Sequence, residues 1–319
     1  MAAPTNLETT VNSVGQRESL DDVIHRVVPE ETPFYSLIRK GKAKARLEEW
    51  QTETLRSPNA DNAALEGNDV GTLDAPNRTT RVGVYCQIFD ETGGVSRTQE
   101  KVDLAGRKSE MARQKALKGI EVRRDIEARI IGNYASQNES GSNPRKTAGM
   151  LSWIETNDDR GVGGSAGGWN TGGVVDAASN GTQRTFTEAQ VKSIMAAAFN
   201  NGAKPTVCFV SAAHKQAFSA FTGIADIRRD VKGQEQAVIH AAADVYVSDF
   251  GAVQIVPHPY GLTRDALFVT PGMVEWRVLD GWKTKALAKT GDSERFLMTH
   301  EGCLAVLNEK AHGVIADLS

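Results

Sequence analysis

The segment that decides the fold is VDLAGRKSEMARQKALKGIEVRRDIEARIIGN, residues 102–133. Its apolar residues recur at helical spacing and form one stripe, while charged side chains cover most other positions. This spacing predicts one helix over 102–133, about 45 Å long, in which Gly119 is the weak position. Such a helix is longer than a typical domain needs and indicates an elongated subunit. The stripe comprises Ala112, Ala116, Ile120, Ile126 and Ile130, widened by Leu104, Met111 and Leu117.

A long hairpin is predicted upstream of this helix. Residues 42–56 and 79–89 each alternate with a period of two, which is typical of strands, and the stretch 57–78 between them is polar. Because a two-stranded ribbon is marginal on its own in water, we expect it to pack on something outside its own subunit. The first strand carries a cationic face and continues to Trp50; that face is Lys42, Lys44 and Arg46.

The chain before the hairpin is predicted to be an arm. Residues 1–30 are polar apart from a short apolar patch at 23–28, so they need another surface to lie on. Residues 32–41 then form a short apolar turn or helix that ends at Gly41.

The second half of the chain has an α/β pattern. A run rich in glycine, serine and asparagine at 157–182 indicates a flexible loop or insertion. Thr187, with Gln190 at the capping-box position, begins a helix that continues to Gly202. Short strands and one further helix follow; the strands are 206–210, 243–250, 252–257, 266–269, 274–278 and 303–307, and the helix is 212–221.

The composition excludes several classes of protein. The 319 residues are 40% hydrophobic and 24% charged, near the norm for soluble globular chains. No window approaches the about 20 apolar residues that span a bilayer, and we expect no signal peptide. A net charge of −3 argues against a protein whose main task is to grip nucleic acid. We expect the widely spaced Cys86, Cys208 and Cys303 to be buried small hydrophobes in a reducing cytosol, not a disulfide framework or zinc site.

Motifs for catalysis are weak. Residues 163–167 match GxSxG in letters only, because a nucleophile elbow needs a strand before it and a helix after it. The glycines at 161–166 form a loose dinucleotide pattern that opens no helix, and the acidic pair at 158–159 is expected to be solvated. Six single histidines form no metal-ligand motif. We therefore expect no catalytic residue, no cofactor and no metal.

The basic run from Arg39 to Arg46 allows three interpretations: phosphate contacts, the solvated face of a strand, or the complement of an acidic patch on a neighbouring subunit. Elements without a core of their own, in a chain without a catalytic set, are typical of subunits that interlock in a shell or filament.

The order of these elements resembles the major capsid proteins of tailed bacteriophages, which have the Hong-Kong-97-type fold. The resemblance runs from end to end of the chain and rests on the order of several short segments. These are SVGQRESLDDVI (13–24), TPFYS (32–36), EWQT (49–52), TQE (98–100), DLAGR (103–107) with the rest of the helix to GN (132–133), RKTAGMLSWI (145–154), GTQRTFTE (181–188), ADVYVSDFG (243–251), AKTGDSE (288–294) and NEKAHGVIADL (308–318).

The resemblance implies an α+β capsid fold with an N-terminal arm, an extended loop, a peripheral domain around a spine helix at 102–133, and an α/β axial domain. The implied ranges are 1–40 for the arm, 41–97 for the extended loop, 98–184 with 270–319 for the peripheral domain, and 185–269 for the axial domain.

The implied function is structural, not enzymatic. A major capsid protein of this class (Caudoviricetes) assembles in the host bacterial cytoplasm into pentamers and hexamers of an icosahedral or prolate head. The virion capsid then encloses packaged double-stranded DNA without sequence-specific binding. The implied partners are further copies of the chain, a separate scaffolding protein, a portal and, in some heads, a decoration protein, with no membrane. A mildly acidic chain fits this role because it avoids multivalent phosphate contacts.

We expect the inter-subunit contacts to involve the cationic strand, with Trp50 on the same strand, and the spine helix of a neighbour. The carboxylates in question are Glu110 and Glu121, and Gly119 is a position where another chain could cross the helix closely.

Two alternatives stay open at this point. An encapsulin-like compartment shell uses the same fold, and a cargo-enzyme gene beside it would favour that interpretation. A hydrolase or oxidoreductase built on the 185–269 lobe would need a pocket with convergent polar groups.

Overall fold

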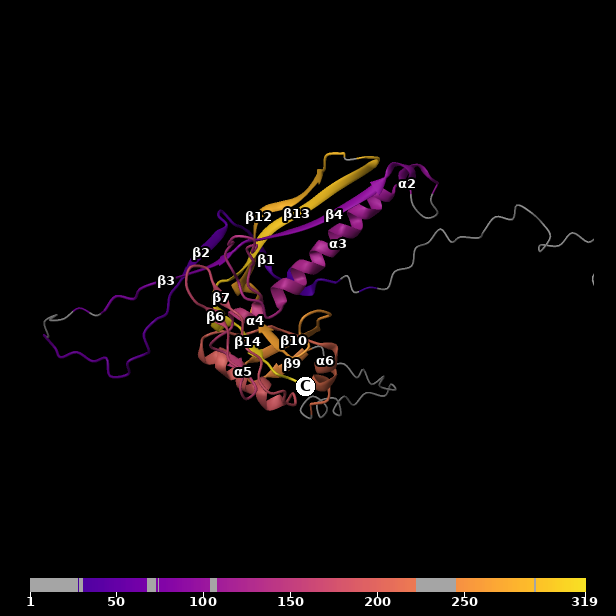
Figure 1. Ribbon diagram of the computed structural model, residues 1–319. Coiled ribbons are helices and arrows are strands. Elements are labelled where there is room, and N and C mark those ends of the chain that lie inside the picture. The colour runs from indigo at the N-terminus through magenta and orange to yellow at the C-terminus, as the bar shows by residue number, and fades with distance from the viewer. Residues whose placement is uncertain are drawn as a thin grey trace, which may run out of the picture.

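The structure, a computed structural model, describes residues 28, 31–67, 73, 75–103, 108–221, 245–289 and 291–319. A four-stranded sheet has the order β1-β12-β13-β4, and a six-stranded sheet has the order β5-β14-β11-β8-β10-β9. The first sheet and α3 form an elongated upper part of the molecule in Figure 1, and the second sheet lies below it with α5 and α6. The architecture is therefore mixed α+β, as the sequence predicted.

The described residues form six α-helices. They are α1 (Pro33–Leu37), α2 (Arg97–Lys101), α3 (Glu110–Ile131), α4 (Met150–Trp153), α5 (Glu188–Asn200) and α6 (Ala212–Ser219). The strands are β1 (Arg39–Lys42), β2 (Leu47–Thr52), β3 (Thr80–Tyr85), β4 (Gln87–Ser96), β5 (Asp158–Asp159), β6 (Gly168–Trp169), β7 (Val175–Asp176), β8 (Val207–Val210), β9 (Val245–Ser248), β10 (Gly251–Pro257), β11 (Ala266–Val269), β12 (Val274–Ala286), β13 (Ser293–Val306) and β14 (Gly313–Ile315).

The spine helix is shorter than predicted. The pattern indicated 102–133, whereas α3 has 22 residues from Glu110 to Ile131, and Val102 is the C-cap of the separate short helix α2. Ser109 starts α3, because its side-chain oxygen accepts a hydrogen bond from the Ala112 N–H and so satisfies one of the free amides of the first turn. Leu104, which was expected in the apolar stripe, lies outside the described residues.

The predicted hairpin is confirmed, with changed boundaries. β2 pairs antiparallel with β3, from Leu47 opposite Tyr85 to Thr52 opposite Thr80. The predicted strand 42–56 is in fact two strands, because Lys42 ends β1, which pairs in parallel with β12. The short helix α1 is also confirmed, but Gly41 belongs to β1 rather than ending that helix.

The two long strands of the four-stranded sheet extend well beyond their predicted cores of 274–278 and 303–307. β13 pairs antiparallel with both β12 and β4, and its ladder with β4 runs from Ser293 opposite Ser96 to Gly302 opposite Gln87. Along β13 the buried side chains alternate as Phe296, Met298 and His300. A histidine in the buried row weakens the apolar alternation, and for this reason the sequence pattern indicated too short a strand.

The glycine-rich run at 157–182 is not the free loop that its composition indicated. It contains β5, β6 and β7, and Ser165 and Ser179 exchange backbone hydrogen bonds. A side chain at Gly161 would place its Cβ 2.0 Å from the Thr182 oxygen, so close backbone packing requires glycine there.

The C-terminal lobe follows the predicted α/β order, including the capping box at the start of α5 and the hairpin of β9 and β10. β5 and β14 belong to the same six-stranded sheet as β8 to β11, although they come from outside the expected axial range 185–269. One hydrophobic cluster joins α1, the C-terminal half of α3 and the four-stranded sheet, and a second cluster fills the space under α5 and α6.

Candidate functional site

The described residues offer several surfaces for contact. No group of three or more His, Cys, Asp or Glu side chains among them could hold a metal ion. Within the same residues, no helix has the length and apolar character needed to cross a membrane. The acidic pair predicted to be solvated is also structural, because the Asp158 side chain is 7% exposed and bonds Arg160 at 2.7 Å. Burial raises the pKa of Asp158.

The cationic strand face predicted from the sequence lies at the base of the hairpin and is exposed. Lys42 ends β1, and Lys44 and Arg46 lie in the connection to β2. The backbone N–H of Lys44 donates to Glu48 Oε2 at 3.1 Å, which fixes the turn while the Lys44 side chain is exposed to solvent. All three cations therefore lie on one accessible edge where the hairpin leaves the body.

Trp50 faces its own chain. Its indole N–H donates to the Leu307 oxygen at 3.2 Å, and its ring packs against Trp153 with centroids 5.6 Å apart. The guanidinium of Arg277 lies 5.3 Å from the same ring. In the free subunit, Trp50 therefore fastens the base of the hairpin to the body.

The two spine carboxylates differ in their surroundings. Glu110 is 7% exposed and accepts hydrogen bonds from Arg113 and Gln114 on its own helix. Glu121 is more accessible and pairs with Lys118 at 2.6 Å, with 43% of its side chain exposed. Both carboxylates thus have partners on their own helix.

Gly119 lies in the wall of a surface groove of about 500 Å³ between α3 and the ends of β12 and β13. A Cβ at this position would meet Met298 Sδ at 3.7 Å, an ordinary contact distance. The subunit itself therefore does not require glycine here. The groove has an aromatic and apolar lining with one cation: Tyr35, Ala116, Ile120, Arg123, Trp282 and Met298.

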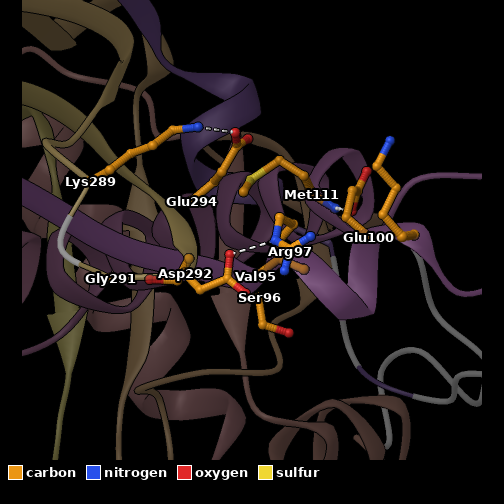
Figure 2. A pocket seen from close by; sticks show the side chains of 11 residues that line it. Val95, Ser96, Arg97, Glu100, Met111, Lys289, Gly291, Asp292 and Glu294 are labelled. Carbon is orange, nitrogen blue, oxygen red and sulfur yellow. Dashed lines mark hydrogen bonds and ion pairs between the residues drawn. The ribbon is translucent and has the colours of Figure 1, made fainter.

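A second pocket, of about 270 Å³, lies where β4, α2, α3 and the β12–β13 turn meet (Figure 2). Val95 and Met111 supply apolar side chains to it, and two ion pairs of 2.7 Å line its edge. These pairs are Arg97–Asp292 and Lys289–Glu294. Such a pocket can accept an apolar side chain, with charged side chains around its rim.

Glu100 holds the start of the spine helix beside this pocket. Its carboxylate accepts hydrogen bonds from the Ser109 hydroxyl at 2.6 Å and from the Glu110 and Met111 amides at 3.1 Å each. These bonds lower the pKa of Glu100, with the Ser109 hydroxyl the largest cause. A negative charge is stabilised at a helix N-terminus, so Glu100 joins α2 firmly to α3.

A fully enclosed polar site joins the arm, the spine and the lower lobe. Glu127 is fully buried and accepts hydrogen bonds from the backbone N–H groups of Phe34 and Tyr35 at 2.8 and 2.7 Å. His258 Nε2, from the segment after β10, lies 2.7 Å from the same carboxylate. Its Nδ1 lies 2.7 Å from the Tyr260 oxygen. One side chain of α3 thus fixes two segments that are distant in sequence.

Sequence reasoning missed Glu127 and His258. The signal was present, because a glutamate between Ile126 and Ile130 falls on the apolar side of the predicted helix, where an unpaired carboxylate would be costly. Its partners could not be predicted, since two of them are backbone amides and the third comes from residue 258.

Burial also shifts two titratable groups near these surfaces. Lys40 lies over the Tyr35 ring, 3.4 Å from its centroid, and burial lowers the pKa of Lys40 to about 8 although Glu127 opposes the shift. His300 stacks on the Trp282 ring with centroids 4.6 Å apart, and its Nε2 accepts a hydrogen bond from the Trp276 indole N–H at 3.1 Å; burial lowers the pKa of His300 to about 4. His300 is therefore neutral at pH 7 and packs as an aromatic side chain behind the groove.

Comparisons with known proteins agree over the whole chain. The family model described as SU10 major capsid protein matches residues 3–319. The major capsid protein of Escherichia phage Phieco32 is 23% identical over 351 residues, covering 99% of this chain and 97% of that protein.

Solved structures share the fold at low identity. A chain from the cyanophage A-1(L) capsid matches with a TM-score of 0.67 and 11% identity, covering 99% of each chain. A chain from the phage G structure of major capsid and decoration proteins matches with a TM-score of 0.56 and 11% identity, covering 100% of each chain. The holo-SrpI encapsulin complex from Synechococcus elongatus PCC 7942 gives a TM-score of 0.55 at 10% identity, covering 96% of this chain and 93% of that chain.

The encapsulin is thus a structural neighbour, whereas the sequence match is to phage capsid proteins, and neither comparison favours a hydrolase or oxidoreductase. The exposed hairpin and the spine helix fit a structural role. The chain therefore belongs to the SU10 major capsid protein family: it is a non-enzymatic component of the virion capsid of a tailed phage, with a Hong-Kong-97-like fold.

Proposed function

We propose that copies of this chain assemble into pentamers and hexamers of a closed icosahedral or prolate head, with each hairpin lying over a neighbouring copy. The observation that carries this proposal is the hairpin itself, whose described residues project away from both sheets (Figure 1). Leu55, Leu65 and Leu73 on this projection are 83–84% exposed. Three accessible leucines on an extension without a core of its own are costly in water unless another surface covers them.

The cationic edge is the proposed polar anchor of this contact. Lys42, Lys44 and Arg46 would pair with carboxylates on the spine helix of a neighbour, and Glu121 is the more favourable of the two candidates. Glu110 is buried and already accepts hydrogen bonds within its own helix, so a new partner would have to displace them. Trp50 would contribute indirectly by holding the hairpin base.

The groove at Gly119 is the proposed crossing point for another chain. Support comes from its apolar lining, in which Trp282 is exposed, and from Gly119 itself, where a Cβ would make only ordinary contacts with Met298. The ranges proposed from the sequence remain 1–40 for the arm, 41–97 for the extended loop, 98–184 with 270–319 for the peripheral domain, and 185–269 for the axial domain. The membership of β5 and β14 in the lower sheet favours moving those two strands to the axial unit.

The other proposed partners follow from the role of a head. Packaged double-stranded DNA would be enclosed without sequence-specific contacts, which fits a net charge of −3. A separate scaffolding protein and a portal would act during assembly in the host cytoplasm. A decoration protein is a further candidate partner, supported by the phage G structure that contains one.

Electron microscopy of the full chain, expressed alone and with a candidate scaffolding protein, tests this proposal. We expect closed shells or rings of five and six subunits. The double variant Lys42→Glu/Lys44→Glu should lower the particle yield, and adding Glu121→Lys should restore part of it. Lys192→Glu on α5 is the charge-reversal control, since this exposed lysine pairs with Glu188 one turn away on its own helix. A monodisperse monomer under both conditions would overturn the proposal that the chain forms a head. An unchanged yield and salt sensitivity in the double variant would overturn the proposed role of the cationic edge.

A further inference from the structure

Two of the three cysteines face each other across the long sheet. The ladder between β13 and β4 pairs Glu301 with Ile88 and Gly302 with Gln87, so the next position sets Cys303 opposite Cys86. The thiol of Cys303 is hydrogen-bonded to that of Cys86. Both side chains are fully buried and both thiols are free. The wide sequence spacing that argued against a disulfide framework therefore conceals a contact pair.

The geometry of this pair suits a covalent bond. Residues directly opposite each other in an antiparallel ladder have Cα atoms about 4.5 to 5.5 Å apart. Disulfides bridge Cα atoms that are about 4.4 to 6.8 Å apart, so no large backbone movement is needed. Cys208, in contrast, belongs to β8 in the other sheet and to the other hydrophobic cluster.

A disulfide between these two cysteines would act on the base of the hairpin. Cys86 separates β3 from β4, where the hairpin joins the sheet. Its N–H donates to the Arg46 oxygen at 2.8 Å, and its thiol lies 3.5 Å from the Ala45 oxygen. A bond from Cys86 to β13 would therefore tie both chain segments at the hairpin base to the central strand of the sheet.

We propose that Cys86 and Cys303 form a redox-dependent cross-link that locks the base of the hairpin to the sheet. The oxidant is a small-molecule disulfide outside the reducing host cytoplasm. One protein thiolate attacks this disulfide and releases one small thiol, and the second protein thiolate then displaces the other. The net reaction turns two protein thiols and one small disulfide into one protein disulfide and two small thiols.

The reaction is slow in the closed subunit. The hydrogen bond to Cys86, together with burial, raises the pKa of Cys303, so little of the nucleophilic thiolate is present. Exchange therefore requires opening of the hairpin base or occurs while the chain folds. This delay keeps the pair reduced during assembly and allows it to oxidise in released particles.

The experiment counts thiols in the full chain. Assembled particles, and chain refolded from denaturant, are incubated with oxidised glutathione, unfolded, and labelled with a maleimide for intact mass analysis. We expect the number of free thiols to fall from three to one without a retained glutathione adduct. A non-reducing digest should contain the Cys86 peptide linked to the Cys303 peptide. The oxidised protein should melt several degrees higher than the reduced one.

Cys208→Ala is the matched variant, which should fall from two free thiols to none. Cys303→Ala should form no internal disulfide and show no melting shift. Three remaining thiols after oxidative refolding, or a disulfide that contains Cys208, would overturn the proposal. Because the digest of the unmodified chain identifies the linked peptides directly, the test stands even if Cys303→Ala folds poorly.

Discussion

The two halves of the spine helix have the same kind of sequence and different surroundings. From Val122 to Ile131 the large apolar side chains are buried in the core of the subunit, and Glu127 is enclosed with them. From Met111 to Glu121 no side chain is fully buried, although Ala116 and Ile120 continue the same stripe. The stripe therefore serves the subunit's own core in one half, and in the other half it lines an open groove.

This difference shows what an amphipathic pattern measures. Periodicity predicts which face of a helix avoids water, and it does not distinguish an internal core from a surface that a second copy covers. In a chain that functions as an assembly, folding stability and assembly should therefore depend on different halves of one helix.

Glu127→Ala should have the largest effect on folding. It would leave two buried backbone N–H groups and His258 without their acceptor, and removing one partner of a buried pair costs about 3–5 kcal/mol. The measurement is the free energy of unfolding of the subunit in urea. Glu121→Ala is the control in the exposed half, where losing a surface ion pair should cost under about 1 kcal/mol. Equal losses in the two variants would contradict the comparison.

Ile126→Ala and Ile120→Ala compare the stripe itself. Ile126 is fully buried, so its truncation should cost about 2–4 kcal/mol of folding free energy. Ile120 lines the groove, and we expect a much smaller loss for it, together with a lower yield of particles. Urea unfolding and particle counts by electron microscopy measure the two quantities. The comparison breaks down if Ile120→Ala destabilises the subunit as much as Ile126→Ala and assembles normally.

The free subunit should lose stability in acid because of His300, behind the groove. Its folded pKa of about 4 lies below the ordinary value of 6.5, so the unfolded chain takes up a proton first as the pH falls. The stability that neutral His300 supplies is complete above pH 6.5 and is lost between 6.5 and 4, by about 1.4 kcal/mol per pH unit. Urea midpoints at pH 6.5 and 5.5 test this. His300→Gln should reduce the pH dependence of the unfolding free energy by the uptake of one proton. If the slope in the variant equals that of the unmodified chain, His300 is not the cause.

Gly119 should give the smallest change in folding and a clear one in assembly. A Cβ fits beside Met298, so Gly119→Ala should stabilise the subunit by about 0.5–1 kcal/mol through helix propensity alone. Gly119→Leu should fold and yet block assembly by filling the groove. Thermal melting and particle yield are the measurements. Normal particles from Gly119→Leu would mean that no chain crosses the helix closely at this point.

Much of the architecture could be predicted from the sequence because helices and strands leave periodic patterns of apolar residues over short segments. The hairpin, the capping box at Thr187 and the order of the α/β lobe are confirmed. The start of the spine helix was wrong because Ser109 and Glu100 create a new helix N-terminus inside a continuous apolar pattern. The sequence predicted a solvated Asp158 because it lies beside a glycine-rich run. In the structure the Asp158 side chain is buried, and its charge is paired with that of Arg160.

The contact surfaces were harder to predict. The cations at the hairpin base could be named from the sequence, although Lys44 and Arg46 lie in a connection and not on the predicted strand. The groove at Gly119 combines residues of α1, α3, β12 and β13 and exists only after folding. The contact between Cys86 and Cys303 depends on the register of two strands more than 200 residues apart, which no local pattern specifies.

The carboxylate of Glu127 holds the base of the arm through the amides of residues 34 and 35, not through their side chains. Every amino acid except proline carries such an amide. The polar attachment to Glu127 is therefore independent of which side chains stand at positions 34 and 35, while Phe34 and Tyr35 themselves are buried in the core of the subunit. At this junction one glutamate of the helix supplies the polar attachment, and the two aromatic side chains supply the apolar packing, so the two contributions can be removed separately by substitution.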